Sequence, residues 1–114
     1  GMNDYSAAWR DVAAAWRERG IAIIAYDQRG FGANKNAGRW PGADSLRQDL
    51  RAALDAADSR YPDAAIFAAG HSLGAAVILS AMKEAPLNVD GVILGAGLRY
   101  VHAPLSRHVV SRFA

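Results

Sequence analysis

Cysteine is absent from all 114 residues, so disulfides and thiolate metal sites are excluded. No apolar run is long enough to span a bilayer, no stretch resembles a signal peptide, and three scattered histidines lack metal-ligand spacing. We therefore expect no metal, no cofactor and no transmembrane segment. The lack of cysteine favours a reducing compartment such as the cytoplasm, but an export signal would precede Gly1, so location stays open.

Strong charge of one sign is also missing. The 13 basic and 11 acidic residues are spread along the chain and leave a formal charge of only +2, so no nucleic-acid or anionic membrane surface is expected. The chain consists of 52% hydrophobic and 21% charged residues, a composition typical of a globular domain of modest size.

The first part of the chain predicts one amphipathic helix. It runs over residues 5–19, with Asp4 as N-cap and Gly20 as terminator. Trp9 and Trp16 fall on its apolar stripe, and we expect both in the core rather than in a ligand site.

A buried strand is expected next, followed by a long loop and a second helix. The apolar residues 21–26 predict the strand, and residues 27–43 are rich in glycine and polar side chains. Ser45 and Gln48 resemble a capping box for a helix that ends near residues 61–62. Its inward stripe is expected to consist of Leu46, Leu50, Ala53, Leu54 and Ala57.

The second half alternates strand, helix and strand. The apolar run 64–69 predicts a strand, residues 73–83 a helix that is apolar nearly all round, and residues 91–95 a third strand. Strands that are apolar throughout predict a parallel sheet covered on both faces. Sites in such sheets lie at the carboxyl ends of the strands, where Ser72, residues 27–32 and residues 95–97 fall.

Residues 70–74 carry the strongest motif, Gly-His-Ser-Leu-Gly, directly between the strand and the apolar helix. A G-x-S-x-G sequence in this context is typical of a nucleophile elbow, which holds its serine on a cramped turn with the hydroxyl exposed. We expect Gly70 and Gly74 to leave the room that this turn needs.

Residues 26–32, Tyr-Asp-Gln-Arg-Gly-Phe-Gly, together with residues 70–74 and 90–94, resemble the α/β-hydrolase superfamily, and within it the monoacylglycerol lipase and lysophospholipase-like serine hydrolases. The resemblance covers residues 3–97. It implies a partial α/β-hydrolase fold, in which parallel strands alternate with helices and the early and late strands are missing. Residues 1–97 would form the core segment, and residues 98–114 a tail at the start of a cap region.

The resemblance also implies the catalytic roles. Ser72 would be the nucleophile, and the backbone N–H of Leu73 one oxyanion donor. Met2 would supply the second donor if residues 1–4 belong to the loop before the first helix; an expression scar is the alternative for Gly1 and Met2. The implied activity is serine ester hydrolysis through an acyl-enzyme on a small-molecule or lipid-like ester, with serine aminopeptidase or thioesterase as alternatives.

No position matches the acid and base of the family's triad. His71 adjoins the nucleophile, but adjacent side chains on a sharp turn point apart, so we expect it to serve packing. His102 and His108 follow the third strand, and His102 is the weak candidate for the base. Asp90 precedes its strand and is expected to shape a turn.

Two features of the loop have a structural and a functional interpretation. Asp27 and Arg29 either steer substrate or, as we favour, organise their own loop. Trp40 either lines an acyl pocket or, as we favour, lies in the core. Residues 30–32 lack the third glycine of a dinucleotide fingerprint.

In the family's order, a missing strand lies between those at residues 21–26 and 64–69. Each backbone group left buried and unsatisfied there would cost about 1–3 kcal/mol. We therefore expect a longer parent chain, or a second copy or chain that completes the sheet. The alternative function is a non-catalytic fragment or scaffold that associates through these strands.

Overall fold

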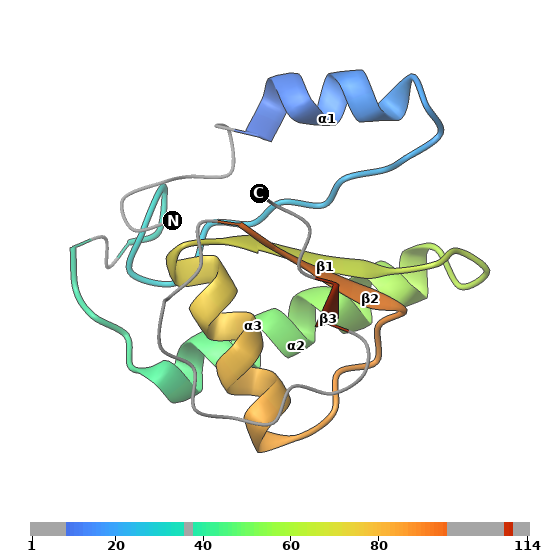
Figure 1. The fold of residues 1–114 in the computed structure, drawn as a ribbon. Helices are drawn as coiled ribbons and strands as arrows, with labels where there is room; N and C mark the ends of the chain where they lie inside the picture. The colour runs from blue at the N-terminus through green and yellow to red at the C-terminus, as the bar shows by residue number, and fades with distance from the viewer. Residues whose placement is uncertain (1–8, 36–37, 96–108, 111–114) are drawn as a thin grey trace.

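A computed structural model describes residues 9–35, 38–95 and 109–110. Three parallel strands form one sheet in the order β1-β2-β3, with α2 and α3 on one side of it and α1 apart on the other (Figure 1). This architecture confirms the expected partial α/β-hydrolase fold. The elements are α1 (Arg10–Arg17), α2 (Ala43–Arg60), β1 (Phe67–His71), α3 (Leu73–Glu84), β2 (Gly91–Gly95) and β3 (Val109–Val110).

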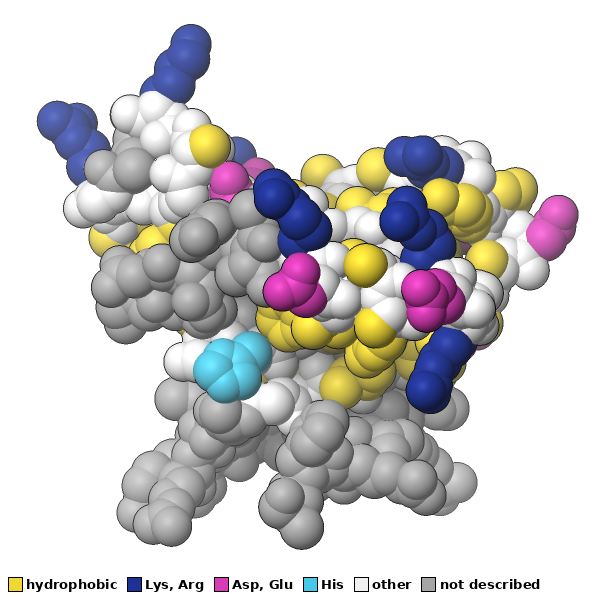
Figure 2. Space-filling view, turned by 90° about the horizontal axis from the view of Figure 1, so that it is seen from above, with side chains coloured by type: hydrophobic (Ala, Val, Ile, Leu, Met, Phe, Trp, Pro, Cys, Tyr) yellow, Lys and Arg dark blue, Asp and Glu magenta, His cyan; other side chains and the backbone are white. Residues whose placement is uncertain are grey.

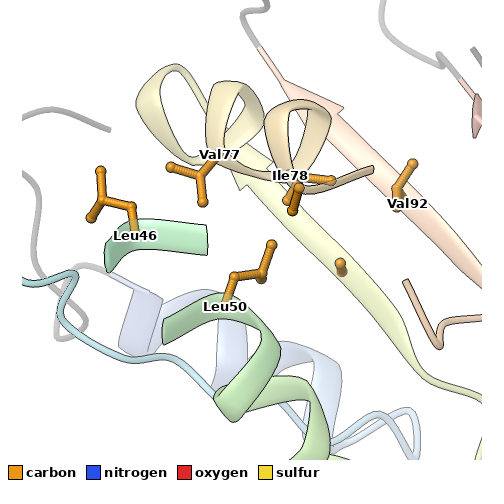
Figure 3. Close-up of a cluster of buried hydrophobic side chains, with 7 residues drawn as sticks. Leu46, Leu50, Val77, Ile78 and Val92 are labelled. Atoms are coloured by element: carbon orange, nitrogen blue, oxygen red, sulfur yellow. The ribbon is translucent and has the colours of Figure 1, made fainter. Parts of the chain in front are cut away.

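The core lies between the sheet and the two helices that cover it. Ala68 of β1 and Val92 of β2 are register partners, and both are buried against side chains of α2 and α3 (Figure 3). Burial of α3 against both the sheet and α2 explains why that helix is apolar nearly all round. The helical members of this cluster are Leu46, Leu50, Val77, Ile78 and Ala81.

The carboxyl end of α1 is closed as predicted. Gly20 has φ 76°, its N–H donates to the carbonyl of Arg17, and the N–H of Ile21 donates to that of Trp16. This pair of bonds is a Schellman motif, which favours glycine because of the positive φ. The expected N-cap, Asp4, lies outside the described residues.

The capping box predicted for α2 is wrong. The helix begins at Ala43, three residues earlier than a Ser45 cap would allow, and Gly42 occupies the N-cap with φ 89° and no side-chain cap. Ser45 is therefore already in the first turn, where it has no role as a cap. The carboxyl end agrees with the prediction, because Tyr61 is the C-cap.

Residues 21–26 do not form the strand that their apolar run predicts. They follow α1 as a segment without strand pairing, and Ile21 and Ile24 are each 47% exposed. A strand exists only through hydrogen bonds to a neighbour, and no described residue supplies one to this segment. The run predicted over residues 64–69 does form a strand, but β1 begins at Phe67 and continues through His71.

The sheet is covered on one face only within the described part of the chain, contrary to expectation. Phe67 is 57% exposed and lies over Gly91 on the face opposite α2 and α3. Trp9 and Trp16, predicted to be core residues, are 37% and 38% exposed, and Trp40 is 63% exposed. All three tryptophan predictions are therefore wrong, and among the described residues no apolar layer covers these side chains. Figure 2 shows hydrophobic side chains at the surface, interspersed with positively and negatively charged side chains.

β3 comes from the segment expected to start a cap region. Val109 and Val110 pair with Val92 and Ile93, which places these two residues in the sheet. No described helix is long and apolar enough to cross a bilayer.

Candidate active site

Ser72 is the single residue that connects β1 to α3, between the last residue of the strand and the first residue of the helix. Its backbone has φ 53° and ψ −111°, and it is the only non-glycine residue with positive φ in the described part of the chain. Such a conformation costs about 1–3 kcal/mol and persists only where the surroundings impose it. The turn thus has the strained backbone that a G-x-S-x-G motif between strand and helix predicts.

The two glycines of the motif play unequal parts. A β-carbon at Gly70 would lie 2.5 Å from the carbonyl carbon of Gly74 and 2.7 Å from the nitrogen of Ala75. At Gly74 an added β-carbon would meet nothing within 4 Å. Only Gly70 is therefore sterically required, which corrects the expectation that both glycines make room.

The backbone of Ser72 is tied to the end of the neighbouring strand. Its N–H donates to the carbonyl of Gly95 at 3.1 Å, and its own carbonyl accepts from the N–H of Ala76 at 3.1 Å. The residue is exposed, and no side chain among the described residues bonds its hydroxyl. Ser72 is therefore exposed to solvent at the carboxyl edge of the sheet.

Leu73 directly follows this serine as the first residue of α3. The amides of a first helical turn have no acceptor within their own helix, and the helix dipole adds partial positive charge there. This position suits a donor to an oxyanion that forms at Ser72. Met2, the other expected donor, lies outside the described residues.

His71 lies on the exposed face of the sheet. A β-carbon at Gly95, its register partner, would come 3.4 Å from Cδ2 of His71, so the ring lies over that glycine. No hydrogen bond joins the imidazole to Ser72 in the described part of the structure, which agrees with a packing role. His102 and His108 lie outside the described residues.

The loop after residues 21–26 is organised around Asp27, as favoured from the sequence. The Asp27 carboxylate accepts from the N–H of Ala33 at 3.0 Å and packs so closely on Gly32 that a β-carbon there would come within 2.4 Å of it. The side-chain amide of Asn34 donates to the carbonyls of Asp27, Gln28 and Phe31. This network gives Asp27 a structural role.

Arg29 ties the same loop to α2. Its Nη2 and Nε donate to the two carboxylate oxygens of Asp49 at 2.7 and 3.2 Å. Asp49 also acts on Tyr26: burial raises the pKa of the Tyr26 hydroxyl above its ordinary value, the Asp49 charge raises it further, and a hydrogen bond with Gln28 opposes both. Within the described residues no hydrogen bond links this loop to Ser72.

The whole chain, residues 1–114, matches the family described as Serine aminopeptidase, S33, of the α/β-hydrolase superfamily. The chain belongs to this hydrolase family. No curated protein and no solved structure matches it significantly.

In this hydrolase Asp90 has a structural role, but it joins two strands and is not seen to shape a turn as expected. Its carboxylate accepts from the N–H of Ile66 at 2.7 Å, and its own N–H donates to the carbonyl of Ile66 at 2.8 Å. These bonds join the starts of β1 and β2, at the end of the sheet opposite Ser72. The described residues contain no cluster of three or more side chains suited to a metal ion.

Two polar residues of the hydrolase escaped prediction from the sequence. Asp49 binds Arg29 from α2, and Arg51 donates to the carbonyls of Ala81, Ala85 and Pro86 at the end of α3. A signal was available for both, because Asp49 and Arg51 adjoin Leu50 and so border the buried stripe of the helix.

Proposed function

We propose that this hydrolase is a serine ester hydrolase in which Ser72 is the nucleophile. The observation that carries the proposal is the strained backbone of Ser72, an exposed residue between β1 and α3. Such strain is retained at catalytic turns because it presents the hydroxyl to a substrate. Family membership supports a hydrolytic reaction.

The reaction would proceed through an acyl-enzyme. Ser72 Oγ attacks the ester carbonyl and its proton passes to a base outside the described residues; when the tetrahedral intermediate collapses, that proton leaves with the alcohol. The N–H groups of Leu73 and, as a second proposal, Met2 stabilise the oxyanion. Removing one such donor typically lowers kcat by about 10²–10³-fold. The substrate would be a small uncharged or lipid-like ester.

A fluorophosphonate probe tests the nucleophile without requiring the substrate. Wild-type protein should be labelled at Ser72, and Ser72→Ala should not be labelled. Ser80 is the matched control, because it is a serine of α3 that accepts a hydrogen bond from Arg47. Labelling that persists in Ser72→Ala or disappears in Ser80→Ala would contradict the proposed role. A folded wild-type chain that stays unlabelled would show that this chain by itself supplies no base that activates Ser72.

A serine aminopeptidase is the second candidate within the same chemistry, and the chain's membership of the serine aminopeptidase family favours it. A free α-amino group on the substrate distinguishes it from an esterase. Turnover of aminoacyl p-nitroanilides with a free amine, blocked by N-acetylation, would support the peptidase. Preference for p-nitrophenyl acyl esters would support the esterase.

A non-catalytic, self-associating scaffold is the candidate of a different class. The favouring observation is that β1 is an edge strand of the described sheet and exposes Phe67 beside it. Free strand edges with apolar side chains pair readily with other chains. Light scattering that finds dimers or larger species, reduced by Phe67→Lys, would support this function, and a monodisperse monomer would exclude it.

A further inference from the structure

A second potential binding site lies in the loop that precedes α2, and it does not depend on the chemistry proposed for Ser72. A cavity of about 230 Å³ is lined by Arg29, Gly30, Arg39, Trp40 and Pro41. Pockets for drug-sized ligands are commonly about 300–1,000 Å³, so this one suits a smaller molecule.

The two walls of the cavity are held together by the backbone. The N–H of Gly38 donates to the carbonyl of Gly30 at 2.9 Å, and a β-carbon at Gly30 would lie 2.3 Å from the carbonyl oxygen of Arg39. Gly30 itself is buried. The two arginines are therefore attached to backbone segments that pack directly on one another.

The charge of this cavity is positive. Arg29 uses Nε and Nη2 for Asp49, which leaves the N–H groups of Nη1 available, and its side chain is 48% exposed. Arg39 forms no ion pair with any described residue. The acid of the same loop, Asp27, directs its carboxylate at Gly32 and Ala33. One uncompensated guanidinium and the free side of a second thus remain for an anion.

Trp40 adds a flat apolar wall. It is 63% exposed, and core packing does not account for it. Exposed tryptophan beside arginine is a combination typical of binding sites, because the indole offers large contact area and the guanidinium offers directional donors.

We propose that this cavity binds a small organic anion, with its phosphate or carboxylate group at Arg39 and Arg29 and its planar apolar part on Trp40. Phenyl phosphate and benzoate represent the two anion types, inorganic phosphate lacks the ring, and benzyl alcohol lacks the charge. Phenyl phosphate and benzoate should bind more tightly than inorganic phosphate and benzyl alcohol. The tighter of these two ligands identifies the preferred anionic group. Added salt should weaken both because the site is exposed.

Isothermal titration calorimetry on the full chain tests the site. Arg39→Ala should weaken phenyl phosphate binding about tenfold, the effect of one lost charge-assisted hydrogen bond, and Arg39→Lys should lose less because it keeps the charge. Trp40→Ala should weaken phenyl phosphate but leave inorganic phosphate unchanged. Arg10 is the matched control, an exposed arginine of α1 outside the cavity.

Three results would overturn the proposal. The first is the absence of measurable heat with both phenyl phosphate and benzoate. The second is an affinity for benzyl alcohol equal to that for phenyl phosphate. The third is an equal weakening of phenyl phosphate binding in Arg10→Ala and Arg39→Ala, which would indicate general charge attraction. Circular dichroism spectra of each variant verify that the fold is retained. The Ser72→Ala variant should bind phenyl phosphate like the wild type, which separates this site from the proposed catalytic one.

Discussion

Gly70 packs directly on Gly74, with the backbone of the strand end against the first turn of α3. A β-carbon at position 70 would come within 2.5 Å of the Gly74 carbonyl carbon, so strand and helix would have to separate. We expect Gly70→Ala to lower the free energy of unfolding by about 1–3 kcal/mol, the usual cost of overpacking. Urea denaturation measures this change.

Gly74→Ala is the matched control for that substitution. An added β-carbon there meets open space, and alanine favours a helix by about 0.5–1 kcal/mol over glycine. The control should therefore be neutral or stabilising. Equal destabilisation by both substitutions would show that the contact at Gly70 does not determine the packing of the elbow.

The strain at Ser72 makes a second prediction. Glycine adopts φ 53° and ψ −111° without strain, and alanine does not. The free energy of unfolding of Ser72→Gly should therefore exceed that of Ser72→Ala by about 1 kcal/mol. Thermal denaturation of the two variants measures the difference. If Ser72→Ala proves the more stable variant, the turn holds no appreciable strain.

Arg51 stabilises the carboxyl end of α3. It donates to three carbonyls at 2.8–3.1 Å, those of Ala81, Ala85 and Pro86. Arg51→Met keeps much of the side-chain volume and removes these bonds, and we expect a loss of about 1–2 kcal/mol because the site is partly exposed. Hydrogen exchange should become faster at the end of α3.

Arg60→Met is the control for Arg51, because this exposed arginine at the end of α2 lies over the ring of Tyr61 and forms no hydrogen bond to a carbonyl among the described residues. It should change stability by a few tenths of a kcal/mol at most. A similar loss in both variants, with exchange at the end of α3 unaltered, would rule out the carbonyl contacts as the cause.

Tyr26 predicts a loss of stability in alkali. Its pKa is raised in the folded chain, so the neutral hydroxyl is stabilised below the unfolded pKa, about 10. As the pH rises past that value, the unfolded state loses the proton first, and the free energy of unfolding falls. Tyr26→Phe should reduce the fall in the free energy of unfolding above about pH 10.

Denaturation in urea at neutral and alkaline pH measures the pH dependence of the free energy of unfolding for the wild type and for Tyr26→Phe. A Tyr26→Phe profile that coincides with the wild-type profile would exclude Tyr26 as a source of the alkaline loss.

Local signals allowed much of the site region to be predicted. The turn at Ser72, the helix after it and the strand over residues 91–95 follow from a glycine-bounded motif and continuous apolar runs, which act within a few residues. The structural role of Asp27 also followed, because it binds backbone near a turn.

Distant contacts decided the rest. Arg29 and Asp49 are twenty residues apart, and their pairing depends on how the loop lies on α2. Likewise, Gly70 is essential and Gly74 is not because α3 returns over one end of β1. Composition and periodicity do not report such geometry.

The sequence by itself determined the α/β class, the strand-serine-helix turn and the apolar faces of α2 and α3, since these depend on backbone preferences and side-chain spacing along one segment. Tertiary structure alone decided that residues 21–26 stay unpaired and that the three described tryptophans remain exposed. The physical reason is that strand pairing and burial are properties of two surfaces, and a single segment specifies only one of them.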